Sequence, residues 1–175
     1  MNKNMKMLML TALFAALTAV LAQIAIPIAM IPITMTHVAI FLGASLIGPY
    51  WGMLSQVVYL LLGACGVPVY ANFTGGLGRL TGVTGGYLVG YALCALVAGL
   101  IAKKTKYTYW GMAIGFTAGC VILYVFGSIW FMITMEKSLA YTMASCVFPY
   151  IPGDIVKIII SMFLVKRLQP YMKNI

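Results

Sequence analysis

The chain has very few acidic residues. Asp154 and Glu136 are the only two carboxylate side chains among 175 residues, and all charged types together make up 7% of the sequence. Soluble globular domains contain about 25% charged residues, whereas 63% of this sequence is hydrophobic. These proportions exclude an ordinary soluble protein and indicate an integral membrane protein.

Residues that build catalytic or metal sites are also scarce. There is one histidine, His37, which we interpret as a packing or interfacial residue, and two acids that cannot form a carboxylate pair or a Ser-His-Asp set. The four cysteines lie singly, without zinc or disulfide spacing. The stretch "TGGLGRLTGVTGGY" lacks the Gly-Lys-Ser/Thr ending of a phosphate-binding loop. We therefore expect no enzymatic activity, no metal and no cofactor.

Long apolar runs predict an all-α, polytopic membrane protein with a single transmembrane domain over residues 1–175. Hydropathy and the Pro and Gly positions give six transmembrane helices, at residues 7–26, 33–48, 51–67, 84–102, 110–132 and 152–168. The second and third are separated only by "GPYWG". One broken segment is an alternative interpretation for this pair.

The basic residues predict the orientation, because Lys and Arg collect on the cytoplasmic side of a membrane. With six spans, three clusters lie on one face: Lys3 and Lys6, then Lys103, Lys104 and Lys106, then Lys166, Arg167 and Lys173. Both termini are therefore expected inside (N-in/C-in). Residues 66–83 and 134–152 fall on the outer side, where they could cover an outward-opening cavity, and the second is expected to contain a short interfacial helix.

The acid Asp154 lies in the stretch "VFPYIPGDIVKIII", with Lys157 three positions later. Pro152 and Gly153 precede it as at the start of a helix, so one interpretation is a capping acid paired with a lysine on the same face. However, an ionisable group within a span costs about 2.5 kcal/mol or more, and Ser or Thr would cap the helix at lower cost. We therefore favour a polar ligand site, in which the carboxylate accepts N-H donors and the ammonium binds a carbonyl or an anion.

Arg79 extends this predicted site. It is the only arginine away from the C-terminal cluster, and its guanidinium can hold a ligand carboxylate with two hydrogen bonds, with a lipid headgroup or solvent as the alternative partner. The predicted substrate-binding residues are Asp154, Lys157, Arg79, Asn72, Thr74, Tyr87 and Tyr150, with Tyr70 and Phe73 as further aromatic walls. Gln56, within the third span, is expected to make a helix-to-helix hydrogen bond.

Small residues recur at four-residue spacing, which allows helices to pack closely in lipid. The pairs include Ala12 with Ala16, Ala15 with Ala19, Gly86 with Gly90, and the series Gly111, Gly115 and Gly119, with Gly127 further on. Internal packing explains most of them. A docking surface for another membrane subunit is the alternative, for which the Ala-rich first span is the best candidate.

Four motifs follow one another over nearly the whole chain, in the order "IPIAMIPITMTH", "GPYWG", "GGLGRLTGVTGGYLVG" and "FPYIPGDIVK". Together they resemble the BioY family, the biotin-specific S components of energy-coupling-factor (ECF) transporters. Two positions depart from the family pattern: Val83 stands where proline is usual, and Thr36 with His37 stand where Thr-x-Gln is common.

The resemblance implies a six-helix protein of the prokaryotic plasma membrane that captures biotin at its outer face and has no ATPase of its own. It also implies a transmembrane coupling (T) subunit and ABC ATPase subunits as partners, with Ala12, Ala15, Ala16 and Ala19 as the docking face. Two alternatives stay open at this point. One is capture of another anionic vitamin, and the other is a membrane scaffold without a ligand.

Overall fold

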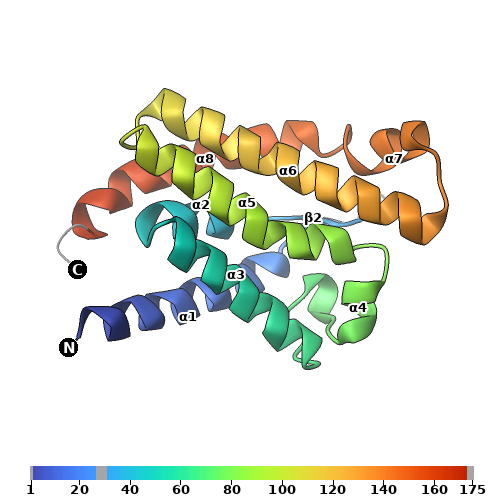
Figure 1. The fold of residues 1–175 in the computed structure, drawn as a ribbon, viewed down its shortest axis with the longest axis horizontal. Coiled ribbons are helices and arrows are strands. Elements are labelled where there is room, and N and C mark those ends of the chain that lie inside the picture. The colour runs from blue at the N-terminus through green and yellow to red at the C-terminus, as the bar shows by residue number, and fades with distance from the viewer. Residues whose placement is uncertain (1, 27–30, 173–175) are drawn as a thin grey trace.

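The computed structural model describes residues 2–26 and 31–172. Within them, each of the six predicted spans corresponds to a helix (Figure 1): α1 (Lys3–Ala22), α2 (Thr36–Leu46), α3 (Pro49–Ala64), α5 (Gly85–Lys104), α6 (Tyr109–Met135) and α8 (Ile151–Met172). Smaller elements connect them: strands β1 (Ala25–Ile26) and β2 (Ile33–Thr34), the 3-10 turn η1 (Ala71–Phe73), and helices α4 (Leu77–Thr81) and α7 (Leu139–Cys146). The all-α, polytopic architecture is confirmed.

The helices differ in how much of a membrane they can cross. Helices α1, α5 and α6 are long and apolar enough to span alone, while α7 and α8 reach that standard together across a 50° bend. Helix α2, with 11 residues, is too short to span alone. It lies instead inside the molecule, where ten of its residues are buried and where it contacts α1, α3, α5 and α8. A helix that is apolar on all sides is stable in such a central place.

One predicted boundary needs correction, and one alternative interpretation is excluded. The first span does not continue to residue 26, because α1 ends at Ala22 and Ala25–Ile26 pairs with Ile33–Thr34 as a short antiparallel ladder. Ile26 is followed by proline in the sequence, and a residue before proline disfavours the helical conformation. The second and third spans are two separate helices rather than one broken segment. Gly48 turns the chain with a φ of 95°, and a Cβ on Gly52 would lie only 2.5 Å from Ala44 Cα.

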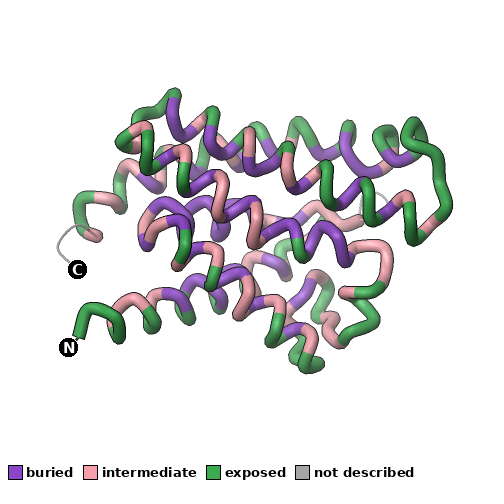
Figure 2. The backbone as a smooth tube through the Cα atoms, viewed as in Figure 1, coloured by how far each residue is buried: buried purple, intermediate pink, exposed green. Residues whose placement is uncertain are grey.

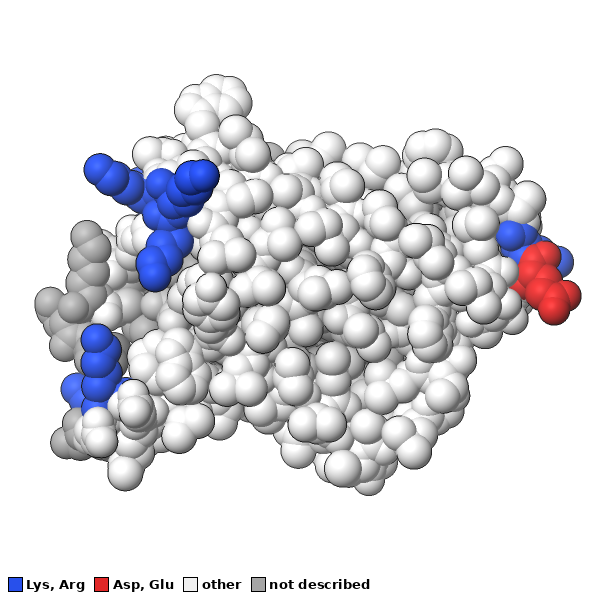
Figure 3. Space-filling model, viewed as in Figure 1, with Lys and Arg blue, Asp and Glu red and all other residues white. Residues whose placement is uncertain are grey.

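The two ends of the molecule carry different charges. The start of α1, the end of α8 and the α5–α6 connection lie at one end, where most of the basic side chains visible in Figure 3 gather. Lys173, also assigned to that group, lies outside the described residues. A further basic side chain lies at the opposite end, beside the acidic one. The opposite end carries α4, the 66–83 segment and α7, which is the expected short helix, with Glu136 just before it. This distribution agrees with most of the basic residues lying on one membrane face.

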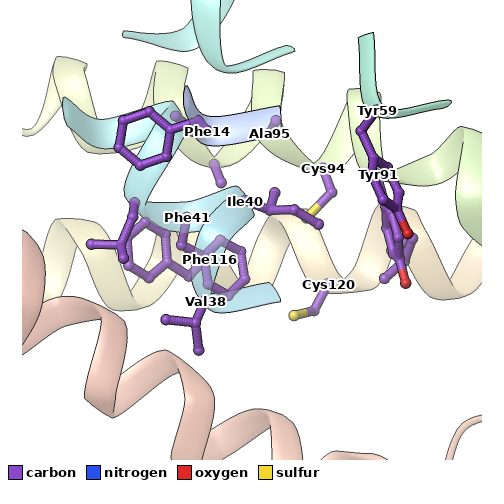
Figure 4. Close-up of a cluster of buried hydrophobic side chains, with 14 of the residues drawn as sticks. Phe14, Val38, Ile40, Phe41, Tyr59, Tyr91, Cys94, Ala95, Phe116 and Cys120 are labelled. Atoms are coloured by element: carbon purple, nitrogen blue, oxygen red, sulfur yellow. The ribbon is translucent and has the colours of Figure 1, made fainter. Parts of the chain in front are cut away.

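The core lies between α2, α5 and α6 (Figures 2 and 4). Phe41 and Phe116 stack there with ring centroids 4.4 Å apart. Glycines let α5 and α6 approach closely, since a Cβ on Gly119 would lie 3.0 Å from Cys94 Sγ and one on Gly115 would lie 3.0 Å from a carbonyl oxygen of α5. The predicted internal packing role of these glycines is therefore confirmed.

Candidate functional site

Two adjoining cavities lie between the outer segments and the N-terminal end of α2. The larger, here called the outer chamber, has a volume of about 200 Å³ and is bordered by the 70–84 segment and by Tyr59, Tyr87 and Tyr91. The smaller, here called the inner chamber, has a volume of about 40 Å³ and is bordered by Asp154, Lys157 and again Tyr87 and Tyr91. The shared wall residues make the two chambers neighbours.

The structure brings together every residue predicted for the substrate site. Tyr87 borders both chambers. The outer chamber also receives Asn72, Thr74 and Arg79, and the inner chamber also receives Asp154, Lys157 and Tyr150. Phe73, expected as an aromatic wall, lines neither chamber and is 72% exposed, so that expectation was wrong.

Asp154 and Lys157 form a buried ion pair in the first turns of α8. Their residues are 5% and 4% exposed, and Lys157 Nζ lies 2.8 Å from Asp154 Oδ1. The Tyr124 hydroxyl of α6 donates a hydrogen bond to Asp154 Oδ2. Among the described residues the carboxylate thus bonds to side chains and to no backbone N-H group. Helix capping therefore does not account for this acid.

The buried ion pair has space beside it. Burial of two charges is costly even when they are paired, and an uncharged pair of similar volume is often no less stable. The inner chamber, at about 40 Å³, exceeds the volume of about 10–15 Å³ that one water needs. A small polar group can therefore enter next to the carboxylate and the ammonium, which packing alone would not require.

Arg79 lies at the rim of the outer chamber. Its residue is exposed, and within the described part of the chain no carboxylate lies within 4.0 Å of its guanidinium. Asn72, on the same rim, has a left-handed backbone with a φ of 58°, which is uncommon outside glycine. The rim thus presents a cation without an acidic partner next to an amide.

Gln23, at the C-terminal end of α1, holds this rim in place. Its side-chain nitrogen donates hydrogen bonds to the carbonyl oxygens of Val69 and Tyr70, both 3.2 Å away, and its oxygen accepts one from Phe73 N at 2.8 Å. The Tyr70 hydroxyl donates to Leu60 O at 2.8 Å. Burial, with a smaller contribution from a neighbouring cysteine, raises the pKa of Tyr70 to about 12, so this hydroxyl stays a neutral donor near pH 7.

Gln56 makes the helix-to-helix hydrogen bond that the sequence predicts. Its side-chain nitrogen lies 3.2 Å from the hydroxyl oxygen of Thr18 in α1. The Thr18 hydroxyl in turn donates to Phe14 O, 2.8 Å away within α1. The hydrogen bond from Gln56 to Thr18 therefore joins α3 to the inner face of α1.

Sequence reasoning missed several site residues. Tyr91 lies one helical turn after Tyr87 on α5, and its hydroxyl is 3.2 Å from Thr36 Oγ1, which is 2.7 Å from Thr34 Oγ1. The four-residue spacing of the two tyrosines was the available signal. Tyr124 and His37 had no such signal, because they reach Asp154 from other helices.

The structure does not favour a metal ion at this site. Ligand atoms of His37, Cys120 and Asp154 lie within 4.8 Å of one another, which is a possible donor set. However, the Lys157 ammonium already bonds the carboxylate at 2.8 Å and would repel a second cation. A neutral polar group suits these surroundings better.

The predicted partner-binding face of α1 needs one correction. Ala15 is 1% exposed and lies on the inner face with Thr11, Thr18 and Ala22, so it is not available to a partner in this conformation. The other three predicted residues lie on a different side: Ala12 and Ala16 are exposed and Ala19 is half-buried. Steps of four and three residues keep those three on one helical face.

Known proteins resemble this chain over nearly its whole length. The family model described as BioY matches residues 1–174. The probable biotin transporter BioY of Pyrococcus horikoshii is 36% identical over 160 residues, covering 91% of this chain and 94% of that protein. The biotin transporter BioY of Thermotoga maritima is 36% identical over 168 residues, covering 94% and 96%. Among solved structures, the S-component for biotin from an ECF-type ABC transporter aligns with a TM-score of 0.89 and 27% identity, covering 97% of this chain and 95% of that one.

Proposed function

This chain belongs to the BioY family. We propose that it is the substrate-binding S component of an ECF-type ABC transporter, and that it captures biotin on the outward-facing side of the membrane for import. The observation that carries the proposal is the buried Asp154 and Lys157 pair that borders the inner chamber. Charged side chains inside a membrane protein normally face an interior or aqueous pathway that the function uses. The function is transport rather than catalysis.

The charge distribution suggests how biotin lies in the two chambers. The inner chamber contains one anion and one cation, so a carboxylate entering it would meet Asp154, whereas a neutral ureido group would not be repelled. The two ureido N-H groups can donate to Asp154, and the ureido carbonyl can accept from a neighbouring donor. The valerate carboxylate then extends toward Arg79 at the rim, whose guanidinium suits a carboxylate.

The walls of the outer chamber suit the apolar part of biotin. Tyr59, Tyr87 and Tyr91 border it with their rings, and the centroids of Tyr59 and Tyr91 are 6.5 Å apart. Figure 4 shows these two rings beside the apolar core, with their hydroxyl groups directed to the same side. Apolar walls with a few well-placed polar groups are typical of small-ligand sites. The thioether ring would contact the tyrosine faces, and the polar ends would meet the charged groups.

The remaining partners follow from the same assignment. As a multi-pass protein of a prokaryotic plasma membrane, it would assemble with a transmembrane coupling subunit and two ABC ATPase subunits. The small residues Ala12, Ala16 and Ala19 on the outward side of α1 would let a partner helix approach closely. Ala15 would support this face from inside.

A thermal-shift panel of water-soluble vitamins tests the proposal. A ligand that binds only the folded state raises the melting temperature, so biotin and desthiobiotin, which share the ureido ring, should raise it for protein purified in detergent. Thiamine and riboflavin should leave it unchanged. A shift with riboflavin or thiamine alone would assign another vitamin, and no shift with any vitamin at saturating concentration would support a scaffold instead.

A further inference from the structure

His37 is the most unusual polar residue near the proposed site. It is the second residue of α2, it is 9% exposed, and it borders the inner chamber with Asp154 and Lys157. Neither of its ring nitrogens has a hydrogen-bond partner among the described residues. Buried polar groups are nearly always hydrogen-bonded, so each exception needs a physical explanation.

The surroundings of His37 do not supply the missing partner. Its Nδ1 lies 3.7 Å from Asp154 Oδ1, which is too long for a hydrogen bond. The ring is held by aromatic contacts instead, at 5.9 Å from the Tyr91 centroid and 6.2 Å from the Phe41 centroid. The described residues thus fix the orientation of the imidazole without a hydrogen bond to either nitrogen.

We propose that His37 is a ligand-contacting residue, whose imidazole hydrogen-bonds the end of biotin that enters the inner chamber. This inference rests on the proposed function. Asp154 Oδ1 accepts from Lys157 and Oδ2 from Tyr124, which leaves about one acceptor site on each oxygen for the two ureido N-H groups. The ureido carbonyl still needs a donor, which the carboxylate cannot supply. A neutral imidazole offers one donor and one acceptor, and its donor would match the ureido carbonyl. Binding would thereby supply the hydrogen-bond partner that His37 does not find among the described residues.

The single histidine of the chain makes a direct test possible. Protein labelled with ¹⁵N-histidine, purified without a histidine tag, would show the imidazole signals of His37 alone. Titration with biotin should shift these signals saturably, with the same midpoint as biotin binding measured independently by calorimetry. If calorimetry shows binding while the imidazole signals stay unchanged, the inference on His37 is overturned and the proposed function stands. If biotin does not bind at all, both fail.

Substitution gives a second readout. His37→Phe keeps the ring contacts with Tyr91 and Phe41 but removes both nitrogens, so biotin affinity should fall by at least about tenfold while the melting temperature of the ligand-free protein should not fall. His37→Gln, which retains a donor and an acceptor, should recover part of the affinity. A merely structural histidine would instead lower the melting temperature and leave the affinity of the folded fraction unchanged.

Ser45 provides a matched control on the same helix. Its hydroxyl is also buried without a hydrogen-bond partner among the described residues, but it borders neither chamber. Ser45→Ala should leave biotin affinity unchanged. An equal loss of affinity in Ser45→Ala and His37→Phe would show that the effect comes from repacking of α2, and would overturn the assignment of His37 as a ligand contact.

Discussion

Replacement of Asp154 by asparagine tests whether this acid binds the ligand or only stabilises the fold. The substitution keeps the volume of the side chain and removes its charge, so Lys157 becomes a buried cation without a carboxylate. Loss of the ion pair lowers the stability of the free and the bound protein alike, so the loss of affinity comes from the hydrogen bonds between the carboxylate and the ligand. A hydrogen bond to a charged group contributes about 1.5–3 kcal/mol. At about 1.4 kcal/mol for each factor of ten, the loss of one such hydrogen bond should lower biotin affinity by about 10-fold to about 140-fold.

A double variant distinguishes the two causes of this loss. Asp154→Asn combined with Lys157→Met leaves no unpaired charge, so the thermal stability lost in the single variant should return. Biotin affinity should not return, because the ureido group still lacks the carboxylate. Glu136→Gln is the matched control, since Glu136 is the only other acid in the chain and lies exposed at the end of α6. Parental biotin affinity in the double variant, measured by calorimetry in detergent, would refute the reasoning.

Three further predictions address the rim, the wall and the outer face of α1. Arg79→Gln should weaken biotin binding about tenfold or more yet leave the binding of biotin methyl ester, which has no carboxylate, nearly unchanged. Equal losses of affinity for both ligands in a competition assay would contradict the pairing of Arg79 with the biotin carboxylate. Gly127→Ala should lower biotin affinity, because the new Cβ would lie 2.2 Å from the ring of Tyr87 and would displace this wall of both chambers. Gly78→Ala, whose Cβ would have no neighbour within 4 Å, should leave the affinity unchanged, and parallel biotin titrations compare the two variants. Ala16→Leu should reduce co-purification with the coupling subunit while biotin binding persists, and recovery of the complex at parental yield would argue against this docking face.

The parts of the fold that depend on local chemistry could be predicted from the sequence. Apolar runs and basic clusters placed the six helices and their common basic end, because lipid exposure imposes hydropathy on every span. The site residues Asp154 and Lys157 were recognisable because charged residues within an apolar run are costly and three positions bring them to one helical face. Their burial and contact at 2.8 Å agree with that reading.

The rest depends on contacts between distant segments. Tyr124 and His37 approach Asp154 from α6 and α2, and nothing in their local sequences marks them as neighbours of an acid. The face of α1 that packs against the protein could also be predicted only in part. Lipid and the protein interior are both apolar, so an alanine is compatible with either environment. The inward position of Ala15 was marked only by the polar Thr11 and Thr18, which share its face.

Direct titration of the purified protein with biotin tests the central claim, which is that the buried charge pair is kept for a polar ligand entering from outside. Saturable binding of one biotin per chain, with a dissociation constant below about 1 μM, is the predicted result for a capture protein. Weaker binding, or binding that Asp154→Asn leaves intact, would contradict the account.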